Sequence, residues 1–241
     1  MKNLNIILFI FFVLFLILTI FSFDPLPLFL VIFLAFLICL ICLISYLGTD
    51  RGIFAALALI CLPFLLEYLF YKFNLPFFET PLIRYLTTWG LDLPITLTNL
   101  FTVFSVPLLF ISALFFAQKI KLLANIKNYH KTFLFLVTAI LISLNWLMFS
   151  QNQLVYNNFL KWLLVALITN ALIVRFYKFK AQTAEIYKEM PIIIYLAIYG
   201  TSALKRLDSL NLTITALLTL FYLILLYNEF KIKKLKINWP F

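Results

Sequence analysis

Residues 26–71 read LPLFLVIFLAFLICLICLISYLGTDRGIFAALALICLPFLLEYLFY, and this stretch decides the fold class. It contains two apolar runs, Leu26–Leu47 and Ile53–Tyr71, on either side of the short polar segment GTDRG at 48–52. Each run is close to the ~20 residues that an α-helix needs to cross a bilayer, and glycine beside aspartate is typical of a tight turn. The stretch therefore predicts two membrane helices joined as a hairpin.

The composition of the whole chain leads to the same conclusion. Of its 241 residues, 65% are hydrophobic and 12% are charged, and the mean hydropathy is +1.09. Soluble domains contain about 45–50% apolar and about 25% charged residues, so this chain has more apolar surface than a globule of its size can bury. A water-soluble fold is excluded, and residues 1–241 are predicted to form a single integral membrane domain.

Eight apolar runs predict an all-α bundle with about eight transmembrane spans. The N-terminal run is longer than the core of a signal peptide and is counted as the first span. One run is shorter than the ~20 residues that a span needs, so flanking residues must complete it; this run is Pro191–Leu204. The other six are Leu26–Leu47, Ile53–Tyr71, Ile95–Ala117, Thr132–Phe149, Phe159–Phe176 and Leu212–Tyr227.

The distribution of basic residues predicts the orientation. The 19 Lys and Arg residues exceed the 9 Asp and Glu residues, for a net charge of +10, and most gather around Lys119–Lys131, Arg175–Lys188 and Lys231–Lys236. Such loops stay in the cytoplasm, so both termini are predicted to be cytoplasmic, in a plasma membrane of the bacterial type. The basic tail is expected to meet anionic lipid. No nucleic-acid partner is expected, because no basic stripe is interleaved with exposed aromatic residues.

A short helix is predicted near 81–90, on the outer side between the third and fourth spans. Thr80 followed by Pro81 is typical of a helix start, and Gly90 can end the helix. Apolar residues recur on one face between these points. The segment is therefore predicted to lie at the outer membrane interface.

Glu67 is the first candidate for chemistry, because it lies inside the third apolar run. An ionisable group there costs about 2.5–3.5 kcal/mol on insertion scales and usually faces a partner or a cavity. Glu67 could act as a general acid or base, or it could only pair with Arg84 or Lys72 near the outer end of its helix, and both interpretations stay open. Lys161 fits helix packing or an aromatic and basic interfacial belt and is assigned no chemistry.

A second candidate cluster follows helical spacing along the seventh span. Tyr195, Tyr199, Ser202 and Arg206 lie on one face and lead to a second cation, Lys205, at the outer turn. Two adjacent cations there could hold a phosphate or another anionic head group. The alternative is that both side chains reach into the interface like any other basic residue near a helix end.

No metal or cofactor is expected. Cys39 and Cys42 lie in an apolar run, where a lipid-buried helix denies a redox pair its access. The single histidine, His130, cannot supply the ligands of a diiron or two-haem protein. The sequence also contains no paired-aspartate motif of the kind that binds magnesium diphosphate in membrane prenyltransferases.

Residues 73–79 read FNLPFFE and resemble the N-L-P-x-E-E segment of the lycopene cyclase-type carotenoid proteins. The resemblance covers only these residues, and Phe78 and Glu79 stand where those proteins have two adjacent acids. It implies an isoprenoid or lipid substrate. Acid catalysis on an alkene would then use Glu67 and Glu79 as two outer-side carboxyl groups.

The sequence thus favours a protein that binds a hydrophobic lipid or isoprenoid in an outward-side cavity, and leaves open whether it also modifies that molecule as an enzyme. The expected catalytic residues are Glu67 and Glu79, and the expected substrate-binding residues are Arg84, Tyr195, Tyr199, Ser202 and Arg206. One alternative is a small-solute transporter or channel, with a path lined by Glu67 and the hydroxyl groups of Thr98, Thr102 and Ser105. The other is a structural or assembly subunit of a larger membrane complex.

Overall fold

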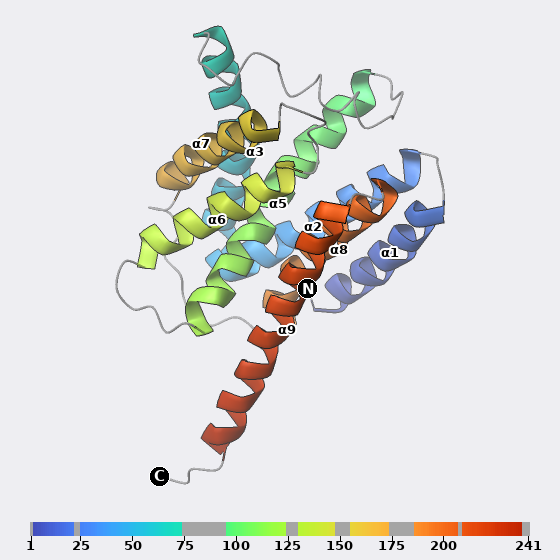
Figure 1. Cartoon of the computed structure of the whole chain (residues 1–241), viewed down its shortest axis with the longest axis vertical. Coiled ribbons are helices and arrows are strands. Elements are labelled where there is room, and N and C mark those ends of the chain that lie inside the picture. The colour runs from blue at the N-terminus through green and yellow to red at the C-terminus, as the bar shows by residue number, and fades with distance from the viewer. Residues whose placement is uncertain are drawn as a thin grey trace.

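The computed structural model describes residues 2–21, 25–73, 95–123, 130–147, 155–173, 186–206 and 209–237. Over these ranges the chain forms eight α-helices and no strand (Figure 1), so the predicted all-helical class is confirmed. In chain order the helices are α1 (Lys2–Phe21), α2 (Pro25–Leu47), α3 (Thr49–Lys72), α5 (Ile95–Leu123), α6 (His130–Leu147), α7 (Val155–Ile173), α8 (Ile186–Arg206) and α9 (Ser209–Ile237).

Three helices are long and apolar enough to cross a membrane. The segments are Leu26–Leu47 of α2, Thr49–Phe70 of α3 and Leu212–Glu229 of α9. Large apolar side chains are exposed on the outside of the bundle, for example Phe21 on α1 and Leu217 on α9. Because so much exposed apolar surface suits a lipid solvent rather than water, these helices indicate a membrane protein. The finer arrangement, eight spans with cytoplasmic termini, stays a prediction.

The hairpin of α2 and α3 closes at the GTDRG turn, as predicted. Gly48 ends α2 with a φ of +88°, a left-handed conformation that favours glycine. Its N–H donates to the carbonyl of Ile44 at 2.9 Å, and the N–H of Gly52 donates to the carbonyl of Gly48 at 2.8 Å. A Cβ atom on Gly52 would lie 2.5 Å from the Cα atom of Ile44. The two helices can therefore approach this closely only because residue 52 has no side chain.

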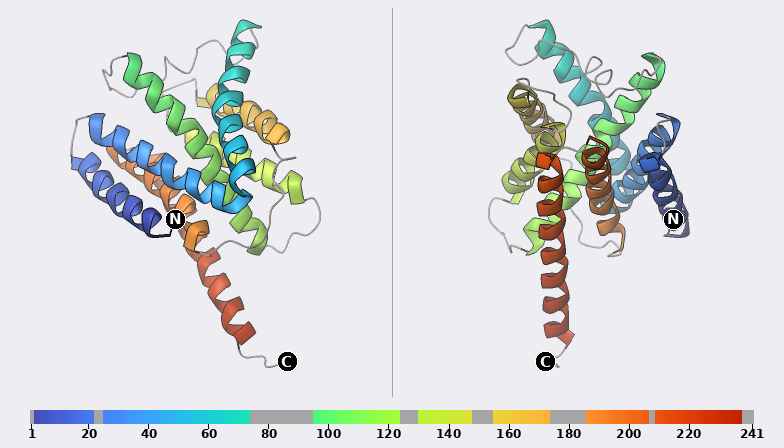
Figure 2. Two further views of the ribbon diagram at one scale, coloured as in Figure 1. Left: turned by 180° about the vertical axis from the view of Figure 1, so that it is seen from behind. Right: turned by 45° about the vertical axis from the view of Figure 1, so that its right-hand side comes forward.

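Helix α5 is the centre of the bundle. It contacts α2, α3, α6, α8 and α9 (Figure 2, green), and every residue in the range 105–117 is buried. A helix buried on all sides needs apolar or small residues around its whole circumference, and the sequence SVPLLFISALFFA supplies them. Just before this range, Phe104 meets the rings of Phe29 and Phe33 of α2 at centroid distances of 6.3 and 5.2 Å.

Helix α8 is longer than the predicted span Pro191–Leu204. It runs for 21 residues from Ile186, which corresponds to about 30 Å at 1.5 Å per residue. The flanking polar residues therefore do extend this helix, and Glu189 lies in its first turn. Near its other end a Cβ atom on Gly200 would lie 3.3 Å from Cγ2 of Thr215, so glycine allows α8 and α9 to pack closely here.

Helix α9 is the least enclosed of the three candidate spans. It contacts α8 and α5, and only 11% of its apolar segment is buried within the protein. Figures 1 and 2 show its C-terminal part extending well past the other described helices. Most of the surface of α9 is therefore left for lipid or for head groups.

Candidate functional site

The structure describes some of the predicted site residues and not others. Glu67 on α3 and Tyr195 and Tyr199 on α8 are described with their side chains, whereas Ser202 and Arg206 are placed in α8 by their backbone. The remaining two, Glu79 and Arg84, lie outside the described residues, as does the helix predicted near 81–90. Whether all seven residues converge on one cavity stays a prediction.

Glu67 is buried between α3 and α7, where it meets a charged partner. Only 6% of the residue is exposed, and its Oε1 atom forms an ion pair with Nζ of Lys161 on α7. The side chain of Lys161 is fully shielded, with 0% exposure. Of the two interpretations that the sequence leaves open for Lys161, helix packing and an interfacial belt, this buried position favours helix packing. The sequence suggests Arg84 or Lys72 as the charged partner of Glu67, and the structure adds Lys161 as a partner.

The surroundings of this ion pair are apolar. On α7, Trp162 and Val165 are buried next to Lys161, and on α3 the residues on either side of Glu67 are apolar or aromatic. Leu65 and Tyr68 of α3 are exposed on the outer surface of the helix. A charged pair in such a place interacts strongly, because little water screens it. It also lies within one helical turn of a lipid-facing surface.

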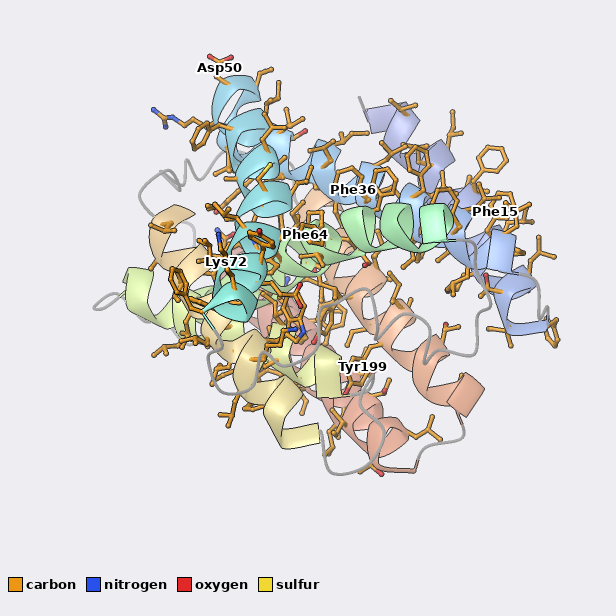
Figure 3. All side chains as sticks on the ribbon, turned by 90° about the horizontal axis from the view of Figure 1, so that it is seen from above. Phe15, Phe36, Asp50, Phe64, Lys72 and Tyr199 are labelled. Carbon is orange, nitrogen blue, oxygen red and sulfur yellow. The ribbon has the colours of Figure 1, made fainter. Side chains whose placement is uncertain are left out.

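The two tyrosines of α8 are packed into the core. The rings of Tyr195 and Tyr199 are stacked with centroids 6.1 Å apart, and Tyr195 donates its hydroxyl hydrogen to the backbone carbonyl of Leu141 on α6 at 2.7 Å. Figure 3 shows Tyr199 among the helices, in contrast to Asp50, which points outward at the start of α3. The structure thus confirms the shared face of Tyr195 and Tyr199. It also gives the hydroxyl of Tyr195 a structural hydrogen bond.

A second polar cluster joins α5, α8 and α9. It is not predicted from the sequence. Nζ of Lys119 on α5 forms ion pairs with Glu189 of α8 and with Glu229 of α9. Tyr222 of α9 donates to Oε2 of Glu189 at 2.6 Å. Lys119 is only 6% exposed, whereas the side chains of the two acids are 25% and 30% exposed. We call these four residues the Lys119 cluster.

Lys119 was predicted to lie in a cytoplasmic loop, and the structure corrects this. Helix α5 does not stop at Ala117 but continues to Leu123. Lys119 is therefore part of this helix, inside the bundle, and not part of a loop. Next to it, Gln118 donates to the hydroxyl of Tyr46 on α2. One feature of the sequence could have indicated this cluster. The acids Glu189 and Glu229 lie at the edges of apolar runs, on the predicted cytoplasmic side where basic residues dominate.

The three cysteines form no disulfide in the described structure. Sγ of Cys39 lies 3.4 Å from the hydroxyl oxygen of Ser112, and both residues are buried. Cys42 is also buried and Cys61 is exposed, and all three are free thiols. Among the described residues, no three His, Cys, Asp or Glu side chains lie close enough together to hold a metal ion.

Comparisons with protein-family models, with curated proteins and with solved structures find no match to this chain. The functional argument therefore starts from the two buried polar groups. The Glu67–Lys161 pair offers one carboxylate and one ammonium group in apolar surroundings. The Lys119 cluster offers two partly exposed carboxylates around a buried ammonium group.

Proposed function

We propose that this chain is a multi-pass membrane protein that binds a hydrophobic lipid or isoprenoid within the bilayer and modifies it at Glu67. The observation that carries the proposal is the burial of Glu67 with Lys161 inside an apolar candidate span. Ionisable groups at such positions are costly and are usually retained for function. Leu65 and Tyr68 lie close by on the exposed surface of α3, so a lipid tail reaches the neighbourhood of Glu67 from the bilayer itself.

The proposed chemistry is proton transfer to a carbon–carbon double bond. The Glu67–Lys161 pair shares a transferable proton, which Glu67 in its protonated form gives to an alkene carbon as a new C–H bond forms. The cation left on the neighbouring carbon is stabilised by the carboxylate of Glu67. Water adds to this cation and passes its extra proton to Glu67, or an adjacent C–H bond breaks and gives its proton to Glu67 as a new double bond forms, so Glu67 is protonated again. Lys161 would position Glu67 and hold the proton between turnovers.

The other predicted residues would bind the remainder of the substrate. Glu79 would supply a second carboxyl group, and Arg84 with Arg206 would hold an anionic or polar end of the molecule at the outer side. Tyr195 and Tyr199 would form an aromatic wall, since their rings are stacked and buried. Ser202 would add a hydroxyl group on the same face of α8.

We further propose eight spans with both termini in the cytoplasm of a bacterial-type plasma membrane. Support comes from the eight described helices and from the lysines that follow α5 and end α9. Alkaline phosphatase and green fluorescent protein fused after residues 48, 125, 180 and 241 test this topology. Fluorescence without phosphatase activity is expected at all four positions, and phosphatase activity at any of them contradicts it.

Lipid profiling of cells with and without the chain tests the proposed function. Expression is expected to change the membrane lipids or pigments, and Glu67→Gln is expected to abolish the change because Gln cannot donate a proton as a carboxyl group does. Asp50→Asn is the matched control, since Asp50 is exposed at the α2–α3 turn. An unchanged profile in a strain that produces folded protein, or full activity in Glu67→Gln, contradicts the proposal.

A carrier for a small solute is the second candidate, because buried charges occur toward both ends of the bundle. Glu67 lies near the Lys72 end of α3, and Lys119 lies near the Leu123 end of α5, and Figure 1 shows these ends pointing in opposite directions. Charged groups at both ends are typical of ion or proton pathways. Solute uptake into proteoliposomes that is lost in both Glu67→Gln and Lys119→Met would favour this candidate over a lipid-modifying enzyme.

A further inference from the structure

Along α9 the residues change from apolar to aromatic to basic, which is the order expected across a membrane interface. Leu217, Leu220 and Ile224 are exposed apolar side chains. Tyr227 follows and is 68% exposed, and tyrosine is enriched at the level of the lipid head groups. The helix then continues without a break through residues 230–237, which read FKIKKLKI. The final two turns of α9 therefore lie where head groups are expected.

These two turns are strongly basic, and the acid next to them is already paired. Four lysines fall within six residues, at positions 231, 233, 234 and 236. Glu229 is the one acidic residue in the sequence of α9, and its carboxylate is in an ion pair with Lys119 of α5. The charge of Glu229 is therefore offset within the protein and does not neutralise the four lysines.

The basic turns also project away from the rest of the protein. Figures 1 and 2 show the C-terminal end of α9 beyond the other described helices in every view. At 3.6 residues per turn, the four lysine positions are spread around the helix axis instead of sharing one face. A flat acidic surface on a single partner protein would meet only part of such a ring, whereas a layer of head groups can surround it.

We propose that residues 230–237 of α9 form a binding surface for anionic phospholipid head groups. Lysines directly after an apolar span attract anionic lipids, each contributing about 1 kcal/mol near the surface. Ile232, Leu235 and Ile237 alternate with the lysines, and such apolar side chains suit the boundary between head groups and acyl chains. This surface is separate from the Glu67 site and does not depend on the proposed function.

Native mass spectrometry of the purified full chain tests the proposal. The protein is titrated in detergent with phosphatidylglycerol or phosphatidylcholine that carry the same acyl chains, and the bound lipids are counted. The first variant replaces all four lysines by glutamine, and the second replaces them by arginine, which keeps the charge. The positional control removes the same number of charges elsewhere, by Lys121→Gln, Lys127→Gln, Lys131→Gln and Lys178→Gln.

The wild-type chain is expected to bind phosphatidylglycerol at least ~10-fold more tightly than phosphatidylcholine. Each lysine near the surface contributes roughly fivefold in affinity, which corresponds to about 1 kcal/mol. The glutamine variant should lose this preference, and the arginine variant and the positional control should keep it. Equal binding of both lipids by the wild type overturns the proposal. So does an equal loss in the positional control, or displacement of phosphatidylglycerol by an equal concentration of inorganic phosphate.

Discussion

Removing one member of the Glu67–Lys161 pair is expected to destabilise the protein much more than removing both. Glu67→Gln keeps the volume of the side chain but removes the carboxylate that forms an ion pair with the ammonium group of Lys161, whose side chain is 0% exposed. Breaking a buried pair in this way costs about 3–5 kcal/mol. The Coulomb energy of two charges ~4 Å apart at an effective dielectric constant of about 20 is ~4 kcal/mol, which agrees with that range. Lys161→Met is expected to cost a similar amount.

The double variant, Glu67→Gln with Lys161→Met, distinguishes this explanation from a simple loss of packing. It removes both charges of the pair, and neutral replacements of a buried pair are often tolerated without loss of stability. The double variant should therefore recover most of the stability that either single variant loses. Unfolding by sodium dodecyl sulfate in mixed micelles measures the stability of all four proteins.

The double-mutant cycle measures the coupling energy between Glu67 and Lys161. A coupling energy of at least ~2 kcal/mol is expected, as for residues in direct contact within one charged network. Asp50→Asn is the control and should change the unfolding free energy by less than about 0.5 kcal/mol, because Asp50 is exposed. Two single variants that each cost under ~1 kcal/mol and add in the double variant would refute the buried ion pair.

Three further substitutions test other parts of the structure. Gly52→Ala places a Cβ atom 2.5 Å from the backbone of Ile44, so it should destabilise the α2–α3 hairpin by about 1–3 kcal/mol, seen as a lower melting temperature in detergent. Lys119→Met leaves the carboxylates of the Lys119 cluster without their common cation and should increase proteolysis of the α8–α9 region, whereas Lys119→Arg should not. Thr169→Val should be neutral or stabilising in the same melting assay, because Oγ1 of Thr169 is buried and has no hydrogen-bond partner among the described residues.

The helices could be predicted from the sequence because their causes are local. The turn between α2 and α3 follows from Gly48 and Gly52, whose backbone freedom and missing side chain appear directly in the sequence as GTDRG. Apolar runs of sufficient length then predict the helices on both sides. The ends were less predictable, because α5 and α8 extend through polar residues such as Lys119 and Glu189, which form an ion pair between the two helices.

The charge partners could not be predicted from the sequence. Glu67 and Lys161 are separated by 94 positions, and Lys119 and Glu229 by 110. The sequence shows that a carboxyl group inside an apolar run needs a partner, but the choice among the available lysines depends on which helices pack together. The local pattern left Lys161 between helix packing and an interfacial belt and placed Lys119 in a loop; tertiary packing decided the first and corrected the second.

The two charged groups differ in what they do for the fold, and this difference favours Glu67 as the functional residue. The Lys119 cluster ties together three helices, including α9, whose apolar segment is only 11% buried. The docking of α9 therefore offsets the cost of removing these charged groups from water. The Glu67–Lys161 pair joins α3 to α7, and α3 also packs against α2 and α5. A fully shielded ion pair contributes little net stability compared with apolar side chains in the same space. A lipid change that requires Glu67 but tolerates Glu229→Gln would follow from this division of roles.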